Sequence, residues 1–165
     1  MFESGWWDIP RGPALDVATG EGRNALFLAS LGFEVVGVDV SPVALAEARR
    51  RALGAGLSVD WRQADLESEP LPKNRYRLVV DFNYLQRSLT VPLKNSLVPG
   101  GFVVFETYLI DQREIGHPRN PAYLLQRNEL LSMFRDFRVL LYREGKFFDG
   151  GRPAFRAGIF AQKPG

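Results

Sequence analysis

Short apolar runs separated by glycine-containing turns and by amphipathic stretches set the pattern of this chain. The run 14–18 is followed by two glycines, and a second run, 33–38, ends in Asp39. Runs that are this short and apolar throughout are typical of strands buried on both faces of a parallel sheet. The intervening residues 23–31 have the pattern of a helix. The first forty residues therefore predict a β-α-β unit.

The same alternation continues to the end of the chain. Expected elements are strands near 57–62, 78–82, 102–107, 137–143 and 154–162, and helices over 42–52, 85–97 and 128–134. Ser41 followed by Pro42 predicts a helix N-cap with proline in the first helical position, and Asn128 can cap the last helix. Val98–Gly101 is expected to be a turn, 109–121 a polar loop, and the last two strands a pair joined by a glycine-containing loop. Alternating strands and helices favour an α/β fold with a mainly parallel sheet covered on both faces.

The turn after the first strand predicts a nucleotide-type cofactor. Gly20 and Gly22 let the main chain turn tightly and approach a ligand, and the helix that follows presents free N–H groups to it. Asp39, at the tip of the second strand, can accept two hydrogen bonds from the vicinal hydroxyls of a ribose. A turn with no ligand is the structural alternative.

A nicotinamide dinucleotide is the rival cofactor, and the spacing argues against it. The dinucleotide fingerprint Gly-x-Gly-x-x-Gly, laid on Ala18 and Gly20, places Arg23 where the third glycine must allow close helix–strand packing. A dehydrogenase would also need a substrate domain, for which this chain has little length. S-adenosylmethionine is therefore the favoured cofactor.

With these residues in place, the chain resembles the class I S-adenosylmethionine-dependent methyltransferases over nearly its whole length. Residues 22–29, Gly-Arg-Asn-Ala-Leu-Phe-Leu-Ala, resemble the first-helix motif of the small tellurite-resistance-type methyltransferases, and 129–145 is weakly similar to the last helix and strand of that subgroup. The chain departs from the family at Ala18, where glycine or cysteine is more common. The resemblance implies a Rossmann-like, doubly wound, seven-stranded sheet whose last strand is antiparallel and inserts beside the fifth.

The resemblance also implies which residues hold the cofactor. Asp16, the turn from Ala18 to Gly22 with Thr19 and Gly20, and the helix start at Arg23 and Asn24 would surround the methionine portion, although Arg23 and Asn24 have helix capping as an alternative. Asp39 would hold the ribose, with Val40 against the adenine and Ser41 beside them. Asp65 and Leu66 would lie at the adenine amino group, and Asp81 and Phe82 near the sulfonium. Helix or turn capping is the structural alternative for Asp65, and a strand-end turn for Asp81.

In the expected reaction the protein mainly aligns the nucleophile, the methyl carbon and the sulfur, and excludes water. Methyl transfer from a sulfonium is an in-line displacement, so a general base is needed only for an oxygen or nitrogen that must lose a proton. His117, the sole histidine, lies in the loop after the fifth strand and is a candidate, as are Tyr84 and Tyr108. A solvated turn is the alternative for His117. Arg87 and Glu106 are further candidates for lining the pocket.

Composition agrees with one enzyme domain over residues 1–165. The chain is 45% hydrophobic and 12% aromatic, enough to bury roughly two-thirds of its unfolded surface. It has no cysteine, which excludes disulfides, zinc–thiolate sites and a cysteine nucleophile, and we expect no metal site. No apolar stretch reaches the roughly 18 to 20 residues that span a bilayer, and the N-terminus lacks signal-peptide features, so the expected location is the cytoplasm.

The charge balance bears on partners. Twenty-one basic residues face nineteen acidic ones, a formal charge of +2, which does not call for nucleic acid. The cluster Arg49–Arg51 is expected at the end of a helix, where cations complement the dipole, and an RNA-contacting patch is the alternative. The Asp81–Tyr84 segment lacks the proline pair of the Asn/Asp-Pro-Pro-Tyr signature, which disfavours methylation of planar exocyclic nitrogens. We therefore expect a small-molecule methyl acceptor.

Several alternatives stay open at this point. The acceptor could instead be RNA or protein, or the chain could be a catalytically silent cofactor-binding protein. The sequence does not decide between a monomer and a homodimer. Trp6 and Trp7 could cover the cofactor, fill the core or form an interface.

Overall fold

The computed structural model describes residues 9–165, apart from the side chain of Asp149, so the hypotheses about Trp6 and Trp7 fall outside the described part of the chain. Its strands are β1 (Pro13–Val17), β2 (Glu34–Asp39), β3 (Asp60–Gln63), β4 (Tyr76–Phe82), β5 (Leu97–Tyr108), β6 (Arg138–Asp149) and β7 (Arg152–Gln162). Its α-helices are α1 (Arg23–Ser30), α2 (Pro42–Ala55), α3 (Thr90–Ser96) and α4 (Glu129–Met133), and its 3-10 turns are η1 (Arg87–Leu89), η2 (Ile110–Glu114) and η3 (Pro121–Tyr123).

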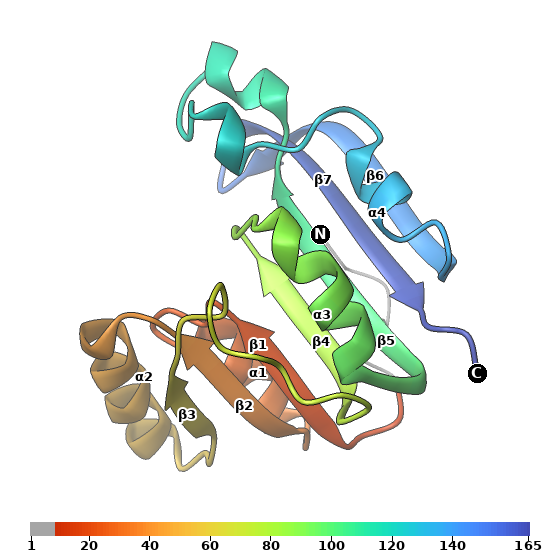
Figure 1. Ribbon diagram of the computed structural model, residues 1–165. Coiled ribbons are helices and arrows are strands. Elements are labelled where there is room, and N and C mark those ends of the chain that lie inside the picture. Colours follow the sequence, from red (N-terminus) through yellow and green to blue (C-terminus); the bar gives the residue numbers. More distant parts are fainter. Residues whose placement is uncertain (1–8) are drawn as a thin grey trace.

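The strands form one seven-stranded sheet in the order β3-β2-β1-β4-β5-β7-β6 (Figure 1). The pairs from β3 to β5 are parallel, whereas β7 runs antiparallel between β5 and β6. This arrangement confirms the Rossmann-like sheet and the antiparallel last strand expected from the resemblance. Strand order reverses between β1 and β4, which makes the carboxyl ends of these strands the switch point of the sheet.

Burial on both faces explains why the strands are short and apolar. Along β1, Ala14 belongs to a core cluster with Leu28 of α1, whereas its neighbour Leu15 belongs to a second cluster with Leu93 of α3. Successive residues of a strand point to opposite faces, so each strand contributes to both clusters. In Figure 1, α3 and α4 lie in front of the sheet and α1 lies behind it.

Two helix predictions need correction. The helix expected over 85–97 is the 3-10 turn η1 followed by the shorter α3. Pro92 is the third residue of α3, within the first turn, where a helix tolerates the missing N–H group. The turn expected at Val98–Gly101 is instead the start of β5, with a register shift in the pairing with β4.

The other correction concerns α2, which runs three residues beyond its predicted end. It stops at Gly56, whose φ of +65° closes the helix in the left-handed conformation. Arg50 and Arg51 therefore lie within α2 rather than at its end, and both pair with Glu47 one turn earlier. The predicted N-cap is confirmed, since the Ser41 hydroxyl accepts a hydrogen bond from the Ala44 N–H.

At α4, Asn128 occupies the N-cap position but does not cap with its side chain. Its φ of +61° is left-handed, and no hydrogen bond from its side chain closes the helix. Its backbone N–H donates to Glu144 of β6 instead. The polar loop expected over 109–121 also contains the short turns η2 and η3.

Candidate functional site

The glycine turn after β1 has the backbone shape that the sequence predicts, and its two glycines serve different ends. Gly20 has φ of +56° and faces open space, since an added Cβ would meet nothing within 4 Å. Gly22 has φ of +82°, and a Cβ there would lie 2.5 Å from the Trp61 ring of β3. Gly20 thus leaves room for a ligand, whereas Gly22 makes room for a tryptophan.

Ala18 opens this turn with φ of +50°, a conformation in which glycine is less strained than alanine. This backbone geometry gives a physical reason for the glycine that the resembling family more often has at this position. Alanine is the smallest residue that can replace it, and here it still adopts the required turn.

Asp39, at the end of β2, is held by the backbone on both carboxylate oxygens. Its Oδ2 accepts from the Gly20 N–H at 2.8 Å, and its Oδ1 accepts from the Ser41 N–H at 2.9 Å. Each carboxylate oxygen has a second lone-pair direction, so both can accept a further hydrogen bond from a ligand. The carboxylate is therefore fixed in place at a half-buried strand end.

Beside Asp39 lies the β2-side cavity, of about 180 Å³. It is lined by Ala18, Val38, Asp39, Val40, Ala64, Asp65, Leu66, Glu67 and Tyr84. Val40 is 60% exposed, an apolar side chain presented to the opening. Asp65 accepts from the Glu67 N–H at 2.9 Å and so also has the turn-capping role that was its structural alternative. An apolar wall next to a carboxylate suits an aromatic base attached to a diol.

The central cavity, of about 430 Å³, opens in front of the glycine turn. It is lined by Ala18, Thr19, Glu21, Arg23, Asn24, Arg51, Phe82, Asn83 and Tyr84. The N-cap of α1 is Gly22, with no side-chain cap, so helix capping is not what Arg23 and Asn24 do. Both line the cavity instead. A guanidinium and an amide here are suitable partners for a ligand carboxylate.

Two buried carboxyls, Asp16 and Asp81, lie next to residues that line the central cavity, Thr19 and Phe82 respectively. Asp16 accepts from the Thr19 hydroxyl at 2.5 Å, and burial raises its pKa to about 7. Burial, together with the charge of Asp16, raises the pKa of Asp81 well above its usual range. Asp81 Oδ1 has no hydrogen-bond partner among the described residues. Neither carboxyl lines the three cavities; Asp16 is linked to the central cavity through its hydrogen bond with Thr19.

A third cavity, the hairpin cavity, has about 380 Å³ and lies between α1, β4, β5 and the β6–β7 hairpin. It is lined by Arg23, Asn24, Phe82, Asn83, Glu106, Tyr108, Arg143, Phe147, Phe148 and Arg156. Glu106 and Arg156 are buried and form an ion pair at 3.2 Å.

The three cavities form one row along the carboxyl ends of the strands. The β2-side and central cavities share Ala18 and Tyr84, and the central and hairpin cavities share Arg23, Asn24, Phe82 and Asn83. A ligand that runs from the diol site at Asp39 to the turn at Thr19 would therefore point its far end toward the hairpin cavity. This shape suits S-adenosylmethionine followed by an acceptor.

Some candidates from the sequence lie outside this row. Ser41 caps α2, and Gly20 and Gly22 shape the turn without lining the three cavities. His117 is exposed and lines none of the three. Among the described residues, no group of three or more His, Cys, Asp or Glu side chains could hold a metal ion.

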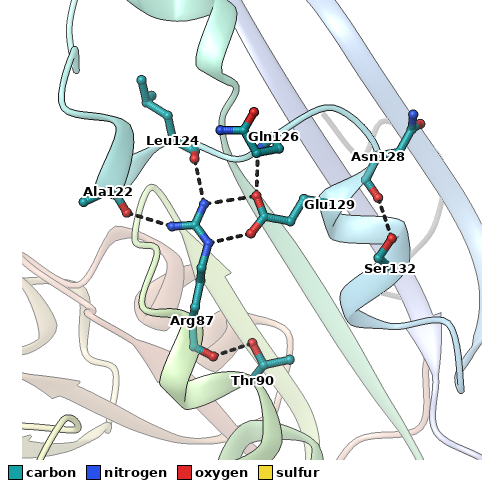
Figure 2. Close-up of polar contacts among 8 residues, drawn as sticks. All are labelled: Arg87, Thr90, Ala122, Leu124, Gln126, Asn128, Glu129 and Ser132. Carbon is teal, nitrogen blue, oxygen red and sulfur yellow. Dashed lines mark hydrogen bonds and ion pairs between the residues drawn. The ribbon is translucent and has the colours of Figure 1, made fainter.

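Arg87, expected in the pocket, instead holds the chain before α4. Figure 2 shows its guanidinium paired with both oxygens of Glu129, at 2.5 and 3.0 Å. It also donates to the carbonyls of Ala122 and Leu124, at 3.1 and 2.9 Å (Figure 2). The Glu129 carboxylate in turn accepts from the Gln126 N–H. We call these contacts the Arg87–Glu129 clamp; they fix the return of the β5–β6 connection.

The sequence reasoning missed several residues of the hairpin cavity. Arg143, Phe147, Phe148 and Arg156 come from the two closing strands, which were assigned only a role in the sheet. One signal was available, because Arg156 interrupts the otherwise apolar run of β7. A charge in a buried strand needs a partner, and Glu106 of the adjacent β5 is that partner.

Comparison with known proteins supports this arrangement. Residues 14–101 match the model of a methyltransferase domain family. Demethylmenaquinone methyltransferase of Thermus thermophilus is 39% identical over 98 residues, which is 54% of this chain and 44% of that protein. Ribosomal protein L11 methyltransferase of the same species is 31% identical over 105 residues, 62% of this chain and 41% of that protein. The chain thus spans less than half the length of these curated relatives.

Solved structures agree in fold. TehB from Haemophilus influenzae superposes with a TM-score of 0.81 at 21% identity, over 94% of this chain and 59% of that chain. An S-adenosylmethionine-dependent methyltransferase from Methanosarcina mazei gives 0.75 at 18% identity, over 92% of both chains. The family match covers more than half of the chain and includes the glycine turn, Asp39 and the switch point. The chain therefore belongs to the methyltransferase domain family, which confirms the methyltransferase resemblance seen in the sequence.

Proposed function

We propose that this protein is a methyltransferase that transfers the methyl group of S-adenosylmethionine to a small molecule held in the hairpin cavity. The observation that carries the proposal is the row of three cavities, in which a cofactor-sized groove leads directly into a separate, partly enclosed space. A space of about 380 Å³ suits a small molecule. One domain over residues 1–165, working in the cytoplasm, belongs to the same proposal.

In this proposal the chain itself binds the cofactor, orients the cofactor and the acceptor, and excludes water from them. Asp39 accepts hydrogen bonds from the ribose hydroxyls. Val40 and Leu66 pack against the adenine, and Asp65 accepts a hydrogen bond from the adenine amino group. Arg23 and Asn24 hold the methionine carboxylate, and Thr19, fixed by Asp16, shapes the turn beneath it. The cofactor, when bound, supplies an activated methyl group on a sulfonium. Phe82 and Asn83, shared by the central and hairpin cavities, lie where donor and acceptor would meet.

The groups at the acceptor end bear on the choice of nucleophile. Tyr108 and Glu106 line the hairpin cavity, but Arg156 lies over the Tyr108 ring and pairs with Glu106. Glu106, the one carboxylate in the described lining of this cavity, is thus engaged in an ion pair. An acceptor atom whose lone pair is available without the loss of a proton is therefore the better match for this cavity.

The names of two curated relatives indicate the kinds of acceptor on which those relatives act. One acts on demethylmenaquinone and another on ribosomal protein L11, a small molecule and a protein respectively. The partly enclosed cavity favours the former kind. An RNA or protein acceptor and a silent cofactor-binding protein are the outcomes against which the test is set. The part of the chain that the structure describes contains no helix long and apolar enough to cross a membrane.

The test is isothermal titration of S-adenosylmethionine and S-adenosylhomocysteine into wild type, Asp39→Ala and Asp39→Asn. We expect wild type to bind in the micromolar range and Asp39→Ala to lose roughly 1 to 3 kcal/mol, the scale of hydrogen bonds to a charged group. Asp39→Asn keeps one acceptor oxygen and should lose less. Glu34→Ala, at the exposed opposite end of β2, is the matched control and should bind like wild type.

Two results would contradict the proposal. Folded protein that binds neither ligand would remove the cofactor site. Binding that is unaffected by both Asp39 substitutions would place the cofactor elsewhere.

Turnover can then be followed as S-adenosylhomocysteine release against a panel of small molecules, RNA and protein. Release with RNA or protein alone would mean that the acceptor is not a small molecule. Sedimentation of the same protein decides between monomer and homodimer.

A further inference from the structure

The hairpin cavity has an uneven charge. Its described lining carries three guanidinium groups, Arg23, Arg143 and Arg156, and one carboxylate, Glu106. Arg156 is 7% exposed and donates to Glu106 at 3.2 Å and to the Asn83 side chain at 2.8 Å. The carboxylate is thus already engaged by the buried arginine, and the lining retains an excess of positive charge.

Arg143 of β6 holds the part of this charge that a ligand can reach. Its guanidinium comes no nearer than 4.0 Å to Glu106, beyond hydrogen-bond distance, and its side chain is 33% exposed. The guanidinium lies over the Phe147 ring, 4.3 Å from the ring centre. Stacking holds the planar group in one orientation, which leaves its N–H edge for an acceptor. A planar fork of donors matches the two oxygens of a carboxylate.

The remaining walls are aromatic. Phe82 comes from the end of β4, Tyr108 from the end of β5, and Phe147 and Phe148 from the hairpin. Phe148 is 74% exposed, so most of its side chain is accessible to a ligand. Aromatic faces on several sides, next to a fixed guanidinium, are suited to a flat apolar body with a charged group at one end.

We propose that the hairpin cavity takes a planar aromatic carboxylate as the acceptor, with Arg143 as the residue that recognises the carboxylate; a lone pair on another atom of the ligand forms the bond to the methyl carbon as the bond from that carbon to the cofactor sulfur breaks. This inference rests on the proposed function for the role of the ligand as an acceptor, but not for its binding. Glu106 and Asn83 hold Arg156 in the wall of the cavity, through contacts at 3.2 and 2.8 Å.

The test is equilibrium dialysis with 2-naphthoate and 2-naphthamide, two probes of nearly the same shape that differ in charge. We expect wild type to bind the naphthoate at least about tenfold more tightly than the amide, as hydrogen bonds to a charged group require. Arg143→Gln should abolish that preference and leave amide binding unchanged. Arg143→Lys, which keeps the charge without the planar fork, should fall between the two.

Arg138→Gln is the matched control, because Arg138 is exposed on the same strand and lies outside the cavity. It should keep the full preference. Equal binding of the two probes to wild type, or the same loss in Arg138→Gln, would overturn the assignment of Arg143. Acetate binding as tightly as naphthoate would overturn the aromatic part. Thermal melts of each variant separate a lost contact from a lost fold.

The two proposals fail separately. Each dialysis is run with and without saturating S-adenosylhomocysteine. A naphthoate preference in a protein that binds no S-adenosylhomocysteine would support the anion site and remove the methyltransferase function. Tight S-adenosylhomocysteine binding with no naphthoate preference would leave the function in place and remove this inference.

Discussion

At the scale of single residues, the backbone of the glycine turn carries strain that can be measured. Ala18 adopts φ of +50°, where its Cβ costs roughly 1 kcal/mol more than glycine would. Glycine, in turn, loses more conformational freedom on folding, by roughly 0.5 to 1 kcal/mol. The native conformation decides between these terms, because an alanine held at positive φ loses more than it saves in the unfolded chain.

We therefore expect Ala18→Gly to leave the free energy of unfolding unchanged or to raise it by up to about 1 kcal/mol. Affinity for S-adenosylhomocysteine should stay within about threefold, since the turn keeps its shape. Chemical denaturation and titration measure the two quantities. Ala55→Gly, in the exposed last turn of α2, serves as the reference and should show the ordinary loss of about 0.5 to 1 kcal/mol. An equal loss at Ala18 would contradict the strain argument.

At the scale of elements, the edge strand β3 and the turn after β1 are fitted to each other through one ring. Trp61 packs where a Cβ on Gly22 would come within 2.5 Å of it and a Cβ on Gly37 within 2.8 Å. The two glycines, on different elements, thus create the space for a tryptophan from a third. The packing links the edge of the sheet to the start of α1.

Gly22→Ala should lower the free energy of unfolding by about 2 to 4 kcal/mol, because it adds overpacking against Trp61 to the strain of a positive φ. Gly20→Ala, where the space is open, should lose only about 1 kcal/mol. Urea denaturation compares the two. In the double variant Gly22→Ala with Trp61→Leu, the additional cost of Gly22→Ala should largely disappear. A cost that persists without the ring would mean that Trp61 is not its cause.

The sequence predicts elements well where a local signal is strong. The apolar runs of β1, β2 and β4, the Ser41–Pro42 cap and the glycine turn all lie where the pattern indicates. It predicts poorly where partners distant in the chain decide. Arg87 was a candidate for lining the pocket, but it pairs with Glu129, 42 residues away in the chain, and forms the clamp. Nothing local marks Gly22 as the neighbour of Trp61, or Arg143 as a wall of the hairpin cavity.

At the scale of the whole molecule, two buried carboxyls make stability depend on pH in an unusual direction. Burial raises the pKa of Asp16 from 3.8 to about 7, and the pKa of Asp81 rises as well. Between about pH 4 and pH 7 the folded protein therefore binds more protons at Asp16 than the unfolded chain does. Stability from this group is complete below about pH 4 and is lost as the pH rises toward 7.

Asp16→Asn should remove the part of this dependence that comes from Asp16. The two pKa values of Asp16 differ by about 3, which corresponds to at most about 4 kcal/mol. We expect the free energy of unfolding of Asp16→Asn to fall less than that of wild type between pH 4 and pH 7, so that the variant gains relative to wild type across this window. Urea denaturation at several pH values measures it. Glu34→Gln, an exposed carboxylate, should follow wild type; parallel curves for all three proteins would contradict the assignment.

The Arg87–Glu129 clamp has a consequence for how this protein can be altered. The connection from β5 to β6 leaves and rejoins the body at one neck, where Leu109 and Leu125 form a bridge and Arg127 pairs with Asp111. Because the clamp fixes the returning end of this connection, the exposed stretch around residues 113–120 is a surface loop with both ends anchored. Lengthening such a loop costs little additional closure entropy. That stretch is a natural place to graft a tag, a recognition peptide or a further domain without disturbing the row of cavities.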